Sequence, residues 1–246
     1  MADVLRSLWI WFACAALVVV WVPLLAVVRL FDRGPLRLRT VRCFYGLGQA
    51  VSRVNPWRLH FSGLDAIRGD SVYVVVCNHQ SLADIPLVSH LNIDAKWLAK
   101  AELFRVPLIG WMMKLAGHIP VYRGERRKAA QSLLQASRCL RQRCSLVFFP
   151  EGTRSKDGRI LPFNDGPFQL AIRERVPVLP VVVEGTGAAL GRSSWIFRGS
   201  PHIFLHVLQP EPVDGLDVKQ VAELRERVRG RMIAALDLLR SGAALP

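Results

Sequence analysis

An uncharged apolar run near the start of the chain constrains the fold more than any other feature. Residues Leu8 to Val28, LWIWFACAALVVVWVPLLAVV, contain no charged side chain. As a helix this run would rise about 31 Å, which is roughly the thickness of the hydrocarbon core of a bilayer. Trp9, Trp11 and Trp21 are amphipathic aromatic residues of the kind found at lipid interfaces. The run therefore predicts a hydrophobic helical membrane anchor.

A cleaved signal peptide is the competing interpretation of this run. It would have a shorter apolar region, a more basic start and a small-residue cleavage site, whereas Arg29, Asp32 and Arg33 follow here. More arginines follow the run than precede it, so the positive-inside bias predicts the cytoplasmic face of a bacterial inner membrane for the rest of the chain. Hydropathy leaves open whether the helix spans the bilayer or dips in and returns. Residues 36–54 predict a second, basic amphipathic helix that lies on anionic headgroups.

The remainder of the chain predicts an α/β fold with a mostly parallel sheet flanked by helices. Short apolar runs alternate there with helical patterns, and 246 residues suffice for one such domain plus an appendage. We therefore expect the anchor and basic helix over residues 1–54 and one α/β domain over residues 55–246. The predicted strands are 58–61, 72–77, 95–99, 119–122, 146–149, 178–183 and 203–208, and the predicted helices are 102–115, 125–143, 165–175 and 218–240.

The net charge of +14 restricts the partners of the chain, since 33 Lys and Arg face only 19 Asp and Glu. Unless it serves solubility alone, such an excess indicates nucleic acid, an anionic membrane or a phosphorylated substrate. The five cysteines show no C-x-x-C spacing, which supports neither a disulfide framework nor a zinc site. We expect no bound metal and no bound cofactor.

The first candidate site is NHQSLAD, residues 78–84, which directly follows a predicted strand. Active-site groups in open α/β sheets gather beyond the carboxyl ends of strands. His79 can take a proton near neutral pH, and Asp84, five residues on, can reach back to one ring nitrogen and fix its tautomer. The alternative is a helix-capping Asp84 and a loop histidine. Ser81 is a possible nucleophile, although no G-x-S-x-G surrounds it.

Three further motifs follow. In FPEGTRS, residues 149–155, Gly152 permits a tight turn that exposes backbone N–H groups, and Arg154 supplies a planar fork suited to phosphate oxygens. The alternative is a surface turn with a solvated arginine. In GHIPVYR, residues 117–123, Arg123 ends a short strand. In VPVLPV, residues 176–181, a proline inside a strand, Pro180, indicates an edge strand or a bulge.

Together and in this order, the four motifs resemble the four blocks of the glycerolipid acyltransferase family, which includes the 1-acyl-glycerol-3-phosphate acyltransferases. The resemblance runs from about residue 57 to residue 208, and it also includes the KAEL sequence that begins at Lys100. Pro120 departs from the family pattern at a position that concerns packing. The resemblance implies catalysis without a covalent enzyme intermediate. It implies catalytic roles for His79 and Asp84, acceptor binding for Arg154 and Arg123, and a pocket wall that contains Pro180.

The reaction that we expect is the transfer of a fatty acyl group from acyl-CoA or acyl carrier protein (acyl-ACP) to lysophosphatidic acid, giving phosphatidic acid. His79, oriented by Asp84, would deprotonate the free hydroxyl of the acceptor. The expected partners are membrane phospholipids and these substrates, and not nucleic acid. We expect Arg154, Arg123 and Lys100 to hold the acceptor phosphate, Glu151 to bond the acceptor or brace Arg154, and Gly152 and Thr153 to provide oxyanion donors.

Alternative functions remain open from the sequence. Within the family, glycerol 3-phosphate or a lyso-ornithine lipid could be the acceptor. A serine hydrolase would use Ser81. A basic protein that binds membranes or nucleic acid without catalysis would explain the charge, but not the two polar motifs at strand ends.

Overall fold

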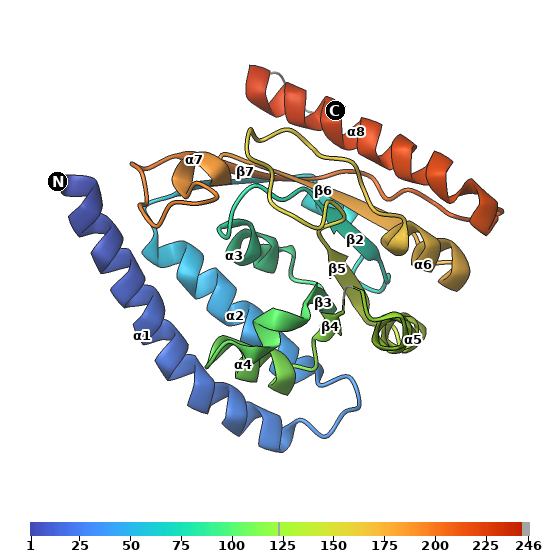
Figure 1. Cartoon of the computed structure of the whole chain (residues 1–246), viewed down its shortest axis with the longest axis horizontal. Coiled ribbons are helices and arrows are strands. Elements are labelled where there is room, and N and C mark those ends of the chain that lie inside the picture. Colours follow the sequence, from blue (N-terminus) through green and yellow to red (C-terminus); the bar gives the residue numbers. More distant parts are fainter. Residues whose placement is uncertain (123, 243–246) are drawn as a thin grey trace.

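A seven-stranded sheet forms the middle of the molecule in the computed structural model, which describes residues 1–122 and 124–242 (Figure 1). The strands are β1 (Arg58–Ser62), β2 (Val74–Cys77), β3 (Ala95–Lys100), β4 (Ile119–Val121), β5 (Ser145–Phe148), β6 (Val178–Glu184) and β7 (His202–Val207). They lie in the order β1-β7-β6-β2-β5-β3-β4. Each strand occupies a segment for which the sequence predicts one.

The described strands pair in parallel except for β6 and β7, which are antiparallel. The prediction of a mostly parallel sheet flanked by helices is therefore confirmed. The central strand β2 has the sequence VVVC, and all four of its residues are buried. A strand with this composition suits the middle of such a sheet because helices cover it on both faces.

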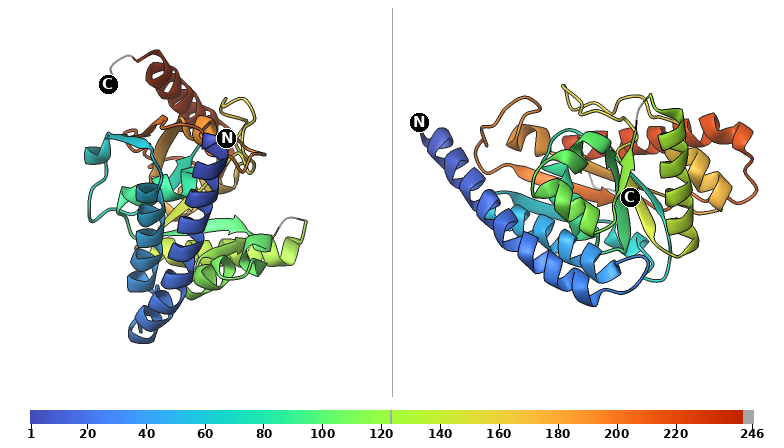
Figure 2. Two further views of the ribbon diagram at one scale, coloured as in Figure 1. Left: turned by 90° about the vertical axis from the view of Figure 1, so that its left-hand side faces the viewer. Right: turned by 60° about the horizontal axis from the view of Figure 1, so that its bottom comes forward.

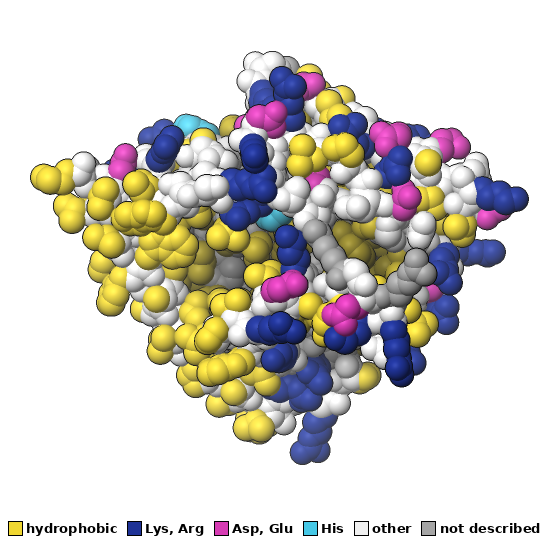
Figure 3. Space-filling view, in the orientation of Figure 1, with side chains coloured by type: hydrophobic (Ala, Val, Ile, Leu, Met, Phe, Trp, Pro, Cys, Tyr) yellow, Lys and Arg dark blue, Asp and Glu magenta, His cyan; other side chains and the backbone are white. Residues whose placement is uncertain are grey.

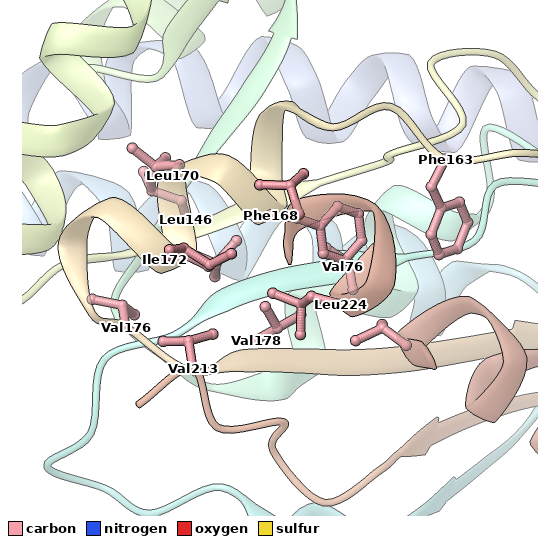
Figure 4. Close-up of a cluster of buried hydrophobic side chains, with 14 of the residues drawn as sticks. Val76, Leu146, Phe163, Phe168, Leu170, Ile172, Val176, Val178, Val213 and Leu224 are labelled. Atoms are coloured by element: carbon pink, nitrogen blue, oxygen red, sulfur yellow. The ribbon is translucent and has the colours of Figure 1, made fainter. Parts of the chain in front are cut away.

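Helices pack on both faces of the sheet. On one face, α2 (Leu38–Val54) and α3 (Asp84–Val88) share a core with the sheet. On the other face the core includes α5 (Arg126–Arg141), α6 (Gly166–Glu174) and α8 (Val221–Ser241). Figure 4 shows part of this second core, in which Phe168 of α6 and Leu224 of α8 belong to the same cluster as Val76 of β2.

The predicted helix over residues 102–115 divides in two. A 3-10 helix, Ala101–Arg105, precedes α4 (Ile109–Leu115), and Pro107 lies between them. Because proline disfavours a helical conformation in the residue before it, Val106 is extended and the helix is interrupted there. Two short helices, α3 and α7 (Thr186–Ala189), have no counterpart in the prediction, since one helical turn carries too few residues to show a period of 3.6. The other 3-10 helices are Leu64–Ala66, Ser89–Leu91 and Val218–Gln220.

Pro180 does not mark an edge strand, and that part of the prediction is wrong. It lies within β6, which is an interior strand between β2 and β7. The register with β2 runs through Pro180 without an extra residue. The antiparallel ladder with β7 ends at Val181, and the Pro180 carbonyl accepts one further bond from the N–H of Leu208 at 3.0 Å. Beyond Pro180 the pairing resumes at Val178 and Glu211, so residues 178–181 face residues 207–211 with one extra residue. Proline, which has no N–H to donate, is tolerated at such a bulge-like irregularity.

The long apolar helix that the sequence predicts is α1 (Ala2–Phe31). Within the described residues it is the one helix long and apolar enough to cross a membrane, by length and composition. Many of its large side chains face away from the protein. Phe12 is 64% exposed and Leu30 is 74% exposed. This exposure distinguishes α1 from a core helix of a soluble protein, and it is consistent with membrane association.

The second N-terminal helix, α2, packs against the sheet as well as against α1. Val41 and Tyr45 are buried, and the Tyr45 hydroxyl donates to the carbonyl of Ala95 at 2.7 Å. The indole N–H of Trp21 in α1 donates to the carbonyl of Cys43 in α2 at 2.9 Å. Figure 2 shows the two helices side by side along one side of the molecule. The division of the chain at residue 54 stays a prediction.

Candidate active site

The NHQSLAD and FPEGTRS motifs meet at one edge of the sheet. Strand β2 pairs in parallel with β5, so both strands end on the same side. Residues 78–84 leave β2 there, and residues 149–155 leave β5 there. Because the carboxyl ends of adjacent parallel strands share an edge, the two motifs become spatial neighbours although about 70 residues separate them in the sequence.

His79 and Asp84 are in direct contact. The His79 Nδ1 lies 2.6 Å from the Asp84 Oδ2, and the same oxygen accepts the backbone N–H groups of Gln80 and Ser81. These bonds close the turn that leads into α3. Asp84 is fully buried, whereas 15% of the His79 side chain is exposed. Since Asp84 engages Nδ1, the Nε2 atom is the ring nitrogen left for a substrate.

A stacked aromatic ring also restrains His79. The rings of His79 and Phe149 have centroids 3.9 Å apart and an interplanar angle of 13°. Phe149 lies in turn beside Trp97, with a centroid separation of 5.5 Å. Because Phe149 sets the plane of the imidazole and Asp84 holds one of its edges, the ring is oriented before any substrate arrives.

Glu151 ties the two motifs together through the backbone. Its Oε1 accepts the N–H of His79 at 2.8 Å, and its Oε2 accepts the N–H of Leu161 at 3.2 Å. Burial raises the pKa of Glu151 to about 7, although these two N–H groups oppose the rise. With both oxygens engaged inside the protein, Glu151 braces the His79 loop, a role that neither of its predicted alternatives included.

The turn after Glu151 closes back on the histidine. Gly152 has a φ of +68°, a conformation that favours glycine, and its N–H donates to the carbonyl of Phe149 at 3.0 Å. Two residues past Thr153, the N–H of Ser155 donates to the carbonyl of His79 at 2.7 Å. The FPEGTRS turn and the His79 loop thus support each other at several backbone positions.

The predicted phosphate ligands differ in how the structure places them. Arg154 lies in this turn, is half-buried and forms no ion pair with a carboxylate in the part of the chain that the structure describes. Lys100 is the exposed last residue of β3, which runs parallel to β5 and so ends at the same edge. Arg123 lies outside the described residues. Pro180 is buried inside β6, level with Val76 of β2, and its place in a pocket wall stays a prediction.

Asn78 and Ser81 have structural contacts beside the histidine. The Asn78 amide exchanges two hydrogen bonds with the backbone of Val183, which joins the loop to β6. Ser81 is fully buried, and its hydroxyl donates to the carbonyl of Leu190 at 2.6 Å. A hydroxyl that is buried and engaged in this way does not favour a serine nucleophile.

Among the described residues, no three His, Cys, Asp or Glu side chains gather closely enough to hold a metal ion.

Known proteins share this arrangement of sequence and fold. The profile of the acyltransferase family matches residues 58–184, a segment that contains both motifs of the site. The chain belongs to the acyltransferase family. It is 34% identical to a chloroplastic 1-acyl-sn-glycerol-3-phosphate acyltransferase of Brassica napus over 73% of this chain and 52% of that relative. It is 31% identical to a Saccharomyces cerevisiae protein of the same name over 80% of this chain and 65% of the relative.

The whole fold of this acyltransferase also has a counterpart of known structure. The crystal structure of the 1-acyl-sn-glycerophosphate (LPA) acyltransferase from Thermotoga maritima matches it with a TM-score of 0.83 and 26% identity. The match covers 97% of this chain and 96% of the other, so it includes the N-terminal helices. By contrast, the chain spans about half the length of the plant relatives that it matches.

Two residues of the acyltransferase site were not expected from the motifs. Phe149 begins the FPEGTRS motif, and its position directly after β5, beside the strand that ends at the histidine, is the signal that predicts its contact with the ring. Arg192 follows α7, and its Nη2 donates to the Thr153 hydroxyl at 3.2 Å. No local pattern marks Arg192, because the contact depends on how a distant loop folds back.

Proposed function

We propose that this acyltransferase transfers a fatty acyl chain from a thioester to the free hydroxyl of 1-acyl-glycerol-3-phosphate, forming phosphatidic acid. The observation that carries the proposal is the oriented His79–Asp84 pair beside a turn whose arginine, Arg154, has no carboxylate partner among the described residues. The names of the plant, yeast and Thermotoga relatives support the same substrate class.

The geometry supports general-base catalysis by His79. Its Nε2 takes the proton of the acceptor hydroxyl while the oxygen attacks the thioester carbonyl carbon. The tetrahedral intermediate then collapses, the C–S bond breaks, and the carrier leaves as a thiolate or takes the proton back from the imidazolium. Asp84 stabilises that imidazolium through Nδ1. The acyl group passes directly to the acceptor, so no enzyme ester forms. Acyl-CoA and acyl-ACP present the same thioester, and we propose either as the donor.

The oxyanion of the intermediate requires donors near His79. The Gly152 N–H already donates to Phe149, so it is a poor candidate in this conformation. The N–H groups of Thr153 and Arg154 donate no hydrogen bond to another described residue. We propose that these two groups, at the turn that closes on His79, stabilise the negative charge as it develops.

The acceptor phosphate needs cations at the same edge. A guanidinium group binds phosphate oxygens through two parallel N–H donors, and Arg154 is available for such a contact. Lys100 at the end of β3 adds a second positive charge, and Arg123 stays a proposed third ligand. A phosphate monoester carries nearly two negative charges at neutral pH, which favours this set of partners over a zwitterionic headgroup.

Membrane docking supplies both lipid substrates. Figure 3 shows hydrophobic side chains covering the side of the molecule where α1 lies, with basic side chains nearer the middle of the same face. Arg33 and Arg39 are exposed just past α1, where anionic headgroups would attract them. We propose that α1 holds the enzyme at the cytoplasmic face of a bacterial inner membrane.

An acceptor panel tests the proposed function. Purified protein in vesicles receives one labelled acyl-CoA together with lysophosphatidic acid, lysophosphatidylcholine, monoacylglycerol, glycerol 3-phosphate or a lyso-ornithine lipid. We expect lysophosphatidic acid to be preferred by at least about tenfold in kcat/KM, since losing a charged contact typically costs 2–5 kcal/mol. Equal use of the neutral and zwitterionic acceptors would contradict the assignment.

A further inference from the structure

The loop between α7 and β7, residues 190–201, places a positively charged side chain at the site although it lies outside the four motifs. Arg192 lies on this loop, is half-buried, and donates from Nη2 to the Thr153 hydroxyl at 3.2 Å. Two partly buried arginines of α8, Arg225 and Arg231, pair with carboxylates. Arg192 forms no such ion pair within the described residues, so its charge is available to an anion.

Two neighbouring contacts place Arg192 beside the histidine loop. Two residues earlier, the Leu190 carbonyl accepts the hydroxyl proton of Ser81, which is itself two residues past His79. On the other side, Thr153 precedes Ser155, whose N–H donates to the His79 carbonyl. The loop is therefore joined to both motifs, and its guanidinium lies at the turn that carries Arg154.

The same loop contacts the N-terminal end of α1. The indole N–H of Trp11 donates to the carbonyl of Trp195 at 2.8 Å, and the N–H of Phe197 donates to the Ser7 hydroxyl at 2.8 Å. Figures 1 and 2 show the start of α1 next to this loop in every view. Trp195 is 48% exposed, as suits a residue at a lipid interface. Arg192 thus lies between the membrane-facing helix and the catalytic base.

We propose that Arg192 binds the phosphate of the lysolipid acceptor together with Arg154. This inference rests on the proposed function. A lipid whose chain stays in the membrane would bring its headgroup toward the site past the start of α1, where Arg192 stands. The Thr153 hydroxyl, which accepts a bond from Arg192, keeps its own proton to donate to a phosphate oxygen. Two guanidinium groups from opposite loops would select a monoester phosphate at the distance that presents the free hydroxyl to His79.

The phosphate that Arg192 binds could instead belong to anionic lipid of the bilayer, and kinetics separate the two sources. Arg192→Ala, Arg192→Lys and the matched control Arg198→Ala are compared with wild type for acylation of lysophosphatidic acid. Arg198 is an exposed arginine of the same loop, so its substitution removes the same charge. Binding to phosphatidylcholine vesicles with and without phosphatidylglycerol is measured in parallel.

We expect Arg192→Ala to lower kcat/KM for lysophosphatidic acid by about tenfold, through a raised KM for the acceptor, with an unchanged KM for acyl-CoA. Arg192→Lys should recover only part of the loss because it lacks the planar fork. Vesicle binding should stay unchanged, and Arg198→Ala should behave as wild type. Equal kinetics for Arg192→Ala and Arg198→Ala would overturn the proposal, and so would a loss that follows weaker binding to phosphatidylglycerol vesicles.

Two controls keep the test decisive. If Arg192→Ala melts well below wild type, Arg192→Lys decides instead, because it retains the charge. A raised acceptor KM at wild-type stability supports the proposal, whereas a wild-type KM overturns it. Failure of the wild-type protein to acylate lysophosphatidic acid would reject the proposed function itself, which this comparison detects before any variant is considered.

Discussion

At the carboxyl edge of the sheet, polar side chains are buried and hydrogen-bonded, whereas along α1 large apolar side chains are exposed. Asp84 and Glu151 are buried at the edge and accept bonds from the histidine loop. On α1, Leu5 and Phe12 are each more than 60% exposed. Both regions depart from the usual distribution of a soluble protein, in opposite directions. We propose that this difference reflects a division of roles, in which the edge performs the chemistry and α1 brings the site to its lipid acceptor.

The largest expected effect concerns the base. His79→Ala should lower kcat by about 10²–10⁴-fold, because general-base catalysis typically contributes that much. Asp84→Asn should cost less, since the ring can still be held while its imidazolium is less stabilised. Steady-state acyl transfer to lysophosphatidic acid measures both variants, with melting temperatures as the control for folding. A well-folded His79→Ala protein with near wild-type kcat would show that His79 at the carboxyl edge of the sheet is not the catalytic base.

A smaller effect is expected on the apolar side. Replacing Leu5, Phe12 and Val20 together by serine should weaken vesicle binding by about 100-fold or more, because burying each such side chain is worth about 1.5–3 kcal/mol. Flotation with vesicles measures the partition. Leu134→Ser, at an exposed position of α5, is the matched control and should change nothing. Unweakened binding of the triple variant would show that α1 is not the docking element.

The smallest effect concerns pH and Glu151. Its pKa of about 7 in the folded protein lies above the ordinary value of 4.5, so the folded state holds more protons between these pH values. Its contribution to the free energy of unfolding therefore falls as pH rises from 4.5 to 7, with a slope of at most about 1.4 kcal/mol per pH unit.

Glu151→Gln removes this titration. The melting temperature of wild type minus that of the variant should decrease from pH 5 to pH 8 in the same micelles. Glu102→Gln, at an exposed glutamate, serves as the control and should follow wild type across this range. A melting-temperature difference between wild type and Glu151→Gln that stays constant from pH 5 to pH 8 would show that the pKa of Glu151 is not raised by its burial.

The sequence predicts the elements of the fold well, because the strands have strong local signals. The apolar run of β2 and the alternation of Ile203 and Leu205 in β7 indicate strands without tertiary information. The division of the helix at Pro107 could have been expected from the proline. The interior position of Pro180 could not, since it depends on the strand order.

The candidate site was predicted less completely than the fold. The His79–Asp84 contact follows from a spacing of five residues and is local. Glu151 was assigned to the acceptor or to Arg154, because nothing in the motif shows that both of its oxygens meet backbone N–H groups. Arg192 has no motif at all, and its place beside Thr153 depends on a loop that three distant segments hold. Local sequence patterns do not predict contacts between loops that are distant in the sequence.

One measurement tests the division of roles most directly. Wild type, His79→Ala and the triple variant of α1 are assayed on a lysophosphatidic acid whose acyl chain is short enough to stay dissolved as a monomer. We predict that the α1 variant matches wild type on this acceptor, because delivery from the membrane is no longer needed, whereas His79→Ala stays about 10²–10⁴-fold slower. An α1 variant as inactive as His79→Ala on the dissolved acceptor would contradict the account.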